Sequence, residues 1–297
     1  MNRPMPRSIN EYLEQLREAL RGQDPALIQD ALYDAEDHLR AEFAENPGIP
    51  AEELLARIAG SYGDPDEVAE IYRDKEIVVN QALRPPLPPA PRSALARFFG
   101  VAADPRAWAA MFYMLLALPT GIFYFTWTVT GLSLSLGLGI LIFGLPLALL
   151  FLASTRVLSL VEGRIVEVML GERMPRRPQY AQRDQPLLER VKGMFTDPRT
   201  WSTMFYMVLM LPLGIIYFTV LITVLSLGLG LALNPLIYPF TGLGLINFDD
   251  QVYMAPLWLQ PFQVLFGIAL LFGLMHLARG VGRLQGAIAK QLLVQAG

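Results

Sequence analysis

Hydrophobic and polar positions divide the first 83 residues into four helical stretches. In the first stretch, apolar residues recur at the three- and four-residue spacing of one α-helical face: Ile9, Leu13, Leu16 and Leu20. Three later stretches show the same spacing, and each begins at a proline that suits the first helical turn: Pro25, Pro50 and Pro65. Residues 8–83 are therefore predicted to form a small all-helical domain, with inward faces that include Leu27, Ala31, Ala35, Leu39 and Phe43 in the second helix and Val68, Ile71 and Tyr72 in the fourth.

The pattern changes to long apolar runs in the rest of the chain. Four segments, 107–131, 136–156, 202–232 and 258–278, approach or exceed the ~20 residues that a membrane-spanning helix needs. The expected fold is therefore all-α: a small soluble helical domain followed by a four-helix transmembrane bundle.

The apolar segments contain an internal repeat. DPRAWAAMFYMLLALPTGIFYFT begins at Asp104 and DPRTWSTMFYMVLMLPLGIIYFT at Asp197, and 23 of 35 positions are identical between 104–138 and 197–231. The second helices align after an insertion of about 30 residues, so that Arg156 matches Arg279 and Gly163 matches Gly286. Each copy is predicted to be a two-helix hairpin, and the copies are parallel repeats about an axis along the membrane normal.

These patterns give five predicted parts. They are an acidic cytoplasmic helical domain at 1–83, a proline-rich linker at 84–103, a first transmembrane hairpin at 104–171, a basic cytoplasmic linker at 172–196, and a second hairpin at 197–297 that carries an extracytoplasmic insert at 233–260.

Composition supports a membrane protein. The chain has 297 residues, of which 53% are hydrophobic and only 17% charged, and it has no cysteine for a disulfide or a thiolate metal site. Residues 1–83 carry 18 acidic and 8 basic residues, a net charge of −10, whereas the remainder carries +7. The acidic domain is therefore not expected to bind nucleic acid directly. Lys and Arg lie before, between and after the hairpins, which predicts that both termini are cytoplasmic.

Repeated prolines mark the candidate ligand site. Pro119 and Pro212 each release a backbone carbonyl four residues earlier, and in lipid that carbonyl needs a partner. Polar residues follow in both copies: Tyr124, Thr126, Thr130, Tyr217, Thr219 and Thr223. In the insert, Phe248, Tyr253, Pro256 and Trp258 could form an apolar lid. Close packing of the helices through Gly121 and Gly214 is the alternative explanation, and the sequence leaves both open.

The segments 156–170 and 277–293 extend the even-numbered spans as amphipathic ends. One reading places them on lipid headgroups. The other makes them a contact surface for the acidic domain, whose charge is opposite.

No sequence motif of an enzyme is found, and neither a cofactor nor a metal site is expected. The two histidines, His38 and His276, are too far apart in sequence for a local metal motif.

The stretches NEYLEQLREALRG, IQDALYDAEDHLRAEF and ELLARIAGSYGDPDEVAEIYR resemble the HAAS family of alpha-helical signalling domains over roughly residues 8–80. That family is often fused to membrane segments and encoded beside PadR-type transcriptional regulators. The resemblance implies a cytosolic signalling partner of that kind.

The stretches LPTGIFYFTWTVTGLSLSLG, LPLGIIYFTVLITVLSLGLG, NPLIYPF and HLARGVGRLQGAIAKQLL resemble the sensor domain of bacterial four-span proteins over about residues 100–295. The resemblance implies a multi-pass sensor of the bacterial inner membrane, and its motifs do not reveal the ligand. The first functional hypothesis is a sensor of a membrane lipid or a small hydrophobic compound. A small transporter and a structural membrane organiser are the alternative functions, and a homo-oligomer is left open.

Overall fold

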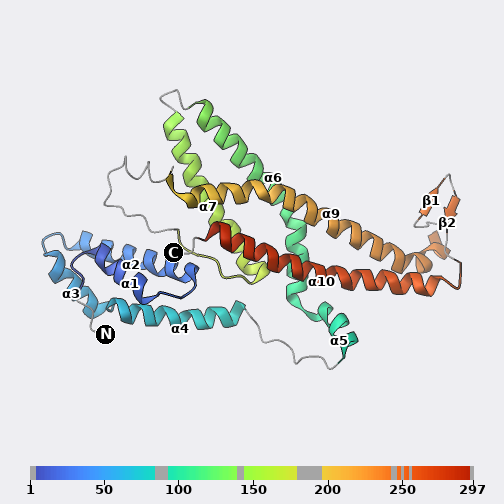
Figure 1. Ribbon diagram of the computed structural model, residues 1–297, viewed down its shortest axis with the longest axis horizontal. Coiled ribbons are helices and arrows are strands. Elements are labelled where there is room, and N and C mark those ends of the chain that lie inside the picture. The colour runs from blue at the N-terminus through green and yellow to red at the C-terminus, as the bar shows by residue number, and fades with distance from the viewer. Residues whose placement is uncertain are drawn as a thin grey trace. The chain divides into compact units, whose positions relative to one another are not determined.

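The computed structural model describes residues 5–83, 93–138, 144–178, 196–241, 246–248, 251–253 and 256–294 (Figure 1). The chain divides into two compact units. The first contains 1–86, 134–204 and 288–297, and the second contains 87–133 and 205–287.

The N-terminal domain, here called the head, has the four predicted helices: α1 (Ile9–Ala19), α2 (Pro25–Glu45), α3 (Ala51–Ser61) and α4 (Pro65–Leu83). Side chains cap three of the starts. Ser8 Oγ accepts a hydrogen bond from the Glu11 amide, Asp24 Oδ1 from the Ala26 amide and Asp64 Oδ1 from the Glu67 amide. Such caps satisfy amide groups that have no partner within the helix.

The apolar faces of the head meet in one core. Its buried members include Tyr12, Leu16, Leu27, Leu39, Leu54, Ile58 and Val68. The prediction for Ile71 was wrong, because this side chain is 48% exposed. Val68 and Ala69 face the core, and the helical period then turns Ile71 outward.

The long helices are α6 (Pro105–Gly137), α7 (Gly144–Leu170), α9 (Pro198–Thr241) and α10 (Gln260–Leu293), with α5 (Ala94–Phe99) and the 3₁₀ helix η1 (Gly100–Ala103) before α6. Among the described residues, three helices are long and apolar enough to cross a membrane: Pro105–Gly137, Pro198–Phe240 and Gln260–Leu293. The predicted span at 136–156 includes 139–143, which lie outside the described residues.

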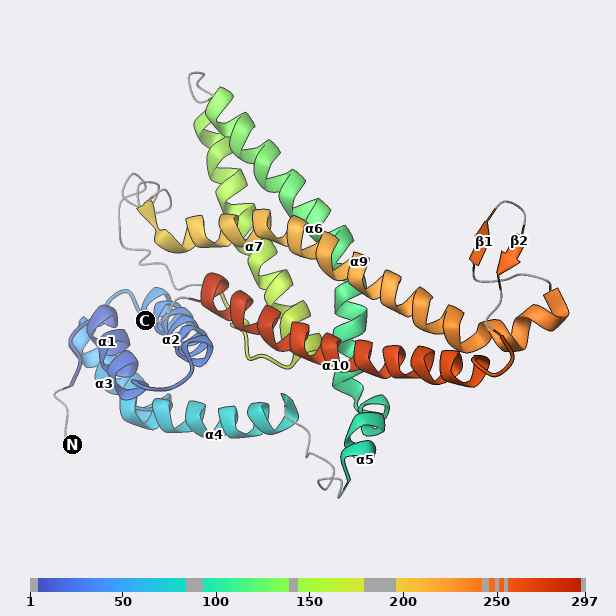
Figure 2. The same ribbon diagram turned by 45° about the vertical axis from the view of Figure 1, so that its right-hand side comes forward.

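Helices α6 and α9 cross each other (Figure 2), and the contacts below place the crossing at equivalent positions of the two repeats. A methyl group added at Gly121 would lie 2.5 Å from the carbonyl oxygen of Met210, and one at Gly214 would lie 2.3 Å from that of Ala117. Met210 is the counterpart of Ala117 in the sequence repeat. Each helix therefore contributes the same two positions to the crossing, a glycine and the residue four places before it. Glycine is needed there because the two backbones meet.

Ion pairs also connect equivalent positions. Arg279 Nε lies 3.2 Å from Asp104 Oδ2 in the second unit. Arg156 Nη2 lies 3.4 Å from Asp197 Oδ2 in the first unit. Because Asp104 matches Asp197 and Arg156 matches Arg279, the aspartate of each copy pairs with the arginine of the other.

One segment departs from the all-helical prediction. The strands β1 (Ile246–Phe248) and β2 (Gln251–Tyr253) pair antiparallel in the predicted insert, with Ile246 opposite Tyr253. Their β-branched and aromatic residues favour strands. Helix α9 also continues to Thr241, past the predicted end of its span at residue 232.

The crossing predicts that Gly214→Ala destabilises the protein, by about 1–3 kcal/mol for an overpacked contact. Gly273→Ala in α10 is the matched control, because nothing lies within 4 Å of the added methyl group. Thermal unfolding followed by circular dichroism in detergent checks both variants. Equal unfolding midpoints for the two variants would contradict the packing role of Gly214.

Candidate functional site

The segment that follows α7 runs along the head in the first unit. Helix α7 ends because Gly171 adopts a φ of +72°, and its amide donates to the carbonyl oxygen of Glu167 over 3.1 Å. This geometry is a common helix C-terminus that glycine adopts without steric cost. Pro175 and Pro178 then disfavour a new helix, so residues 172–178 remain irregular and can contact the head.

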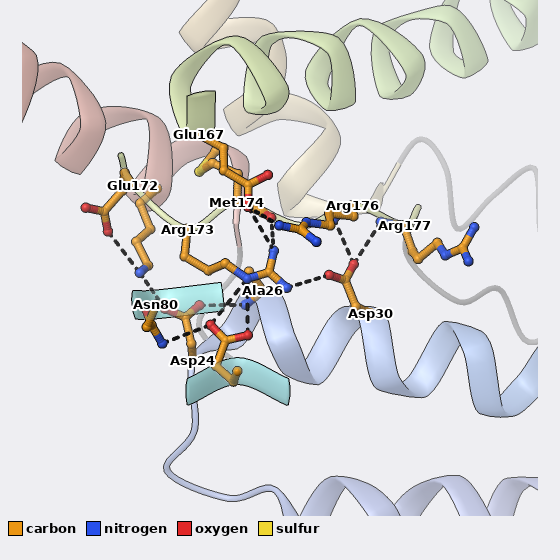
Figure 3. Close-up of polar contacts among 12 residues, drawn as sticks. Asp24, Ala26, Asp30, Asn80, Glu167, Glu172, Arg173, Met174, Arg176 and Arg177 are labelled. Atoms are coloured by element: carbon orange, nitrogen blue, oxygen red, sulfur yellow. Dashed lines mark hydrogen bonds and ion pairs between the residues drawn. The ribbon is translucent and has the colours of Figure 1, made fainter. Parts of the chain in front are cut away.

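Arg173 connects this segment to two helices of the head (Figure 3). Its Nη2 donates to Asp30 Oδ2 of α2 over 2.8 Å, and its Nε donates to Glu76 Oε2 of α4 over 3.2 Å. Its Nη1 lies 3.6 Å from Glu167 Oε1 and donates to the carbonyl oxygen of Met174. The planar guanidinium thus contacts three carboxylates in different directions, as its fixed fork of donors allows.

The Arg173 side chain is only 7% exposed, and Asp30, Glu76 and Glu167 are buried as well. Burial alone would lower the pKa of Arg173, but the hydrogen bond and charge of Asp30 and the charge of Glu76 outweigh it and raise the pKa above its usual value. The arginine therefore stays charged. Removing one partner would leave an uncompensated charge in a buried position.

Asp30 also binds the backbone of the segment. Its Oδ1 accepts hydrogen bonds from the amides of Arg176 and Arg177, each over 2.8 Å. One carboxylate thus binds the guanidinium with one oxygen and the chain with the other (Figure 3). This geometry fixes both the position and the direction of residues 173–177 against α2.

Asp34 continues the contact one turn later on α2. Arg177 Nε lies 2.9 Å from Asp34 Oδ1, and the Tyr72 hydroxyl donates to Asp34 Oδ2 over 2.9 Å. Burial and the charge of Asp34 raise the pKa of Tyr72, so its hydroxyl remains a donor at neutral pH.

A second ion pair connects the head to the end of α10. Lys290 Nζ donates to Asp24 Oδ2 over 2.6 Å and to Glu172 Oε1 over 3.0 Å. Asp24 thus caps α2 with one oxygen and binds Lys290 with the other. Lys290 belongs to the predicted segment 277–293, so at this residue the segment contacts the acidic domain, which was the alternative to a position on lipid headgroups.

A cavity of about 320 Å³ lies beside Arg173 in this seam between the head and the segment. Its lining has both signs of charge and includes Asp30, Asp34, Tyr72, Lys75, Arg176 and Arg177. Water that enters such a space can solvate these groups when they separate.

The predicted ligand residues fall in several different surroundings. Tyr124 and Tyr217 are buried, and the Tyr217 hydroxyl donates to Gln285 Oε1 over 3.0 Å. The prolines and threonines of both copies lie on exposed sides of their helices: Pro119, Thr126, Thr130, Pro212, Thr219 and Thr223. Trp258 is exposed, Phe248 lies in β1 and Tyr253 in β2. A common ligand-binding role for these residues stays a prediction.

Sequence reasoning did not single out Arg173, Asp30, Glu76 or Gln285. The opposite net charges of the two halves indicated that they could attract each other, but charge does not identify the partners. Among the described residues, no group of histidine and acidic side chains is arranged to hold a metal ion.

Comparison with known families adds the identity of the two parts. The Putative sensor family matches residues 113–293, and the HAAS family matches residues 11–71. The chain belongs to the Putative sensor family. No curated protein and no solved structure matches it.

This member of the sensor family is thus a membrane sensor with a HAAS head, and its apolar helices agree with that class. Both families are signalling rather than enzyme families. The contact between Arg173 and Asp30 joins them, because Asp30 lies in the HAAS match and Arg173 in the sensor match.

Arg173→Ala should release the head, because it leaves the carboxylates of Asp30 and Glu76 without their shared partner. Breaking a buried ion pair costs about 3–5 kcal/mol. The measurement is hydrogen exchange of the Arg176 and Arg177 amides, which should become much faster.

Arg57→Ala is the matched control, since Arg57 is an exposed arginine on α3. It should leave exchange at residues 176 and 177 unchanged. If the Arg173 variant behaves like the Arg57 variant, Arg173 does not hold the head in place.

Proposed function

We propose that this chain is a four-span sensor of the bacterial inner membrane, with both termini in the cytoplasm. Its two hairpin repeats respond to lipid or to a small hydrophobic compound in the membrane. The response changes how tightly the HAAS head binds residues 173–177, and the head passes the signal to a cytosolic partner.

The buried contacts of Arg173 are the observation that carries this proposal. The arginine belongs to the segment leaving α7, so a movement of that helix end changes its distance to Asp30 and Glu76. Charge interactions at a buried contact weaken when more water enters. A small movement can therefore shift the head between a docked and a released population.

Exposed residues in both repeats support lipid as the signal. The paired prolines and threonines face outward from α6 and α9, as do Trp108 and Trp201. In a bilayer such positions contact lipid, and tryptophan favours the headgroup zone. On the buried side of α9, the Tyr217 hydroxyl donates a hydrogen bond to Gln285 of α10. The opposite, exposed side of α9 is then the one that faces lipid.

The partner we propose is a cytosolic regulator of the PadR type, or another signalling protein. The head would bind it through surface that becomes free on release, rather than contact nucleic acid itself. The acidic residues that hold Arg173 are the first candidates for that surface, because release exposes them.

The chain has no cysteine, so two spin labels can be introduced cleanly. Glu53→Cys in α3 and Val168→Cys in α7 place labels at two exposed positions of the same unit. The full protein is reconstituted in bilayers of different acyl length and headgroup, and the distance distribution is measured. We expect a single short distance between the two labels in some bilayers, and a second, longer distance in others where part of the population has released the head.

In the Arg173→Ala background the longer distance should dominate in every bilayer. A distribution that is the same in all bilayers, and unchanged by Arg173→Ala, would contradict the proposed signalling.

A further inference from the structure

A small polar cavity lies in the first unit, between the middle of α7 and the start of α9. Its volume is about 60 Å³. A water needs about 10–15 Å³ of such space, so the cavity has room for a phosphate-sized group but not for a whole lipid. The described side chains that line it include Thr155, Arg156, Ser159, Arg199, Thr200 and Thr203.

The threonines are buried, yet they line a space rather than a packed core. Thr155 is 0%, Thr200 3% and Thr203 4% exposed. The Thr155 hydroxyl donates to the carbonyl oxygen of Leu152 over 2.8 Å, and that of Thr200 to Asp197 Oδ2 over 3.4 Å. For Thr203 the described residues provide no hydrogen-bond partner. Among the described residues only the Ser135 hydroxyl is a buried polar atom without a partner, so the Thr203 hydroxyl is open to the cavity and can bond to a group that fills it.

The other repeat serves as an internal comparison. At the matching positions it has no hydroxyl: Ala278 stands for Thr155, Gly282 for Ser159, Ala107 for Thr200 and Ala110 for Thr203. Asp104 and Arg279 nevertheless form the same ion pair there. Hydroxyls are thus not needed for the helices to pair at this point, and four of them gather only at the cavity.

The charges favour an anion. Two guanidinium groups, of Arg156 and Arg199, line the cavity together with one carboxylate, that of Asp197. Asp197 binds Arg156 over 3.4 Å and accepts a hydrogen bond from the Arg199 amide. The balance is one positive charge, and the amino end of the long helix α9 adds to it.

We propose that this cavity binds a phosphate group, either of an anionic lipid headgroup or free in solution. The two arginines supply charged donors, and the Thr203 hydroxyl donates a further hydrogen bond to an oxygen of the phosphate. The Thr155 hydroxyl adds another by turning its one hydrogen from the Leu152 carbonyl to the phosphate. A lipid would place only its phosphate here, with its remaining part outside the cavity.

The cavity also contacts the head. Arg199 Nη1 donates to Gln29 Oε1 over 2.7 Å, and Gln29 Nε2 donates to the carbonyl oxygen of Arg177. A phosphate that draws Arg199 inward would therefore disturb the segment that Arg173 holds. This regulatory link rests on the proposed function, whereas phosphate binding does not.

The test uses the full chain in a neutral maltoside detergent. One arm adds inorganic phosphate, with chloride at equal ionic strength as the reference. The other arm adds phosphatidylglycerol, with diacylglycerol as the reference that lacks phosphate. Saturable increases in the unfolding midpoint give an affinity in each arm, and the arm that stabilises more strongly identifies the source.

Thr155→Ala combined with Thr203→Ala should weaken that affinity by about ten- to a hundredfold, because two hydrogen bonds are lost. The other repeat has alanine at both matching positions, so the geometry accepts it. Ser133→Ala with Ser226→Ala, two exposed and mutually equivalent serines, should keep the wild-type affinity.

Saturable binding in neither arm, or equal affinity of wild type and threonine variant in both arms, overturns the site. Binding that leaves the distance between labels at 53 and 168 unchanged supports the site and overturns only its link to the head. If the labelled protein binds phosphate but shows the same label distances in every bilayer, the result contradicts the proposed function and leaves the phosphate site intact.

Discussion

A guanidinium that has left water must keep its hydrogen bonds to carboxylates, and this requirement determines the arrangement around Arg173. Asp30 and Glu76 come from two helices of the head, and Glu167 comes from α7. Asp30 in addition binds two backbone amides of the same segment. None of these groups can move far without leaving another one buried and unpaired, so the head and the segment behave as one piece while docked.

The membrane part follows a different constraint, that of close backbone approach. Gly121 and Gly214 meet equivalent positions of the opposite copy, and Asp104 and Asp197 each pair with the other copy's arginine. The two copies of the repeated sequence thus make matching contacts with each other. Where the copies differ, as at Thr155 and Thr203, the difference points to a task that only one copy has.

The helices of the head could be predicted because caps and apolar spacing agree at each start. The repeat predicted which residues are equivalent, and Gly121 and Gly214 were recognised as packing candidates. Arg173 could not be identified in this way, because the net charge of the head does not tell which of its acidic residues bind which basic residue. Tyr124 and Thr126 were both predicted to line the ligand site, but their separation of two residues puts them on different sides of α6.

The most direct measurement of this account is a double-mutant cycle between Asp30 and Arg173 in the full chain. Asp30→Ala, Arg173→Ala and the double variant are compared by the free energy of head docking, taken from the populations of the two label distances. The account predicts a favourable coupling of about 1.5–3 kcal/mol, so that the second substitution costs little once the first is made. Additive effects, within about 0.5 kcal/mol, would contradict the central role of this contact.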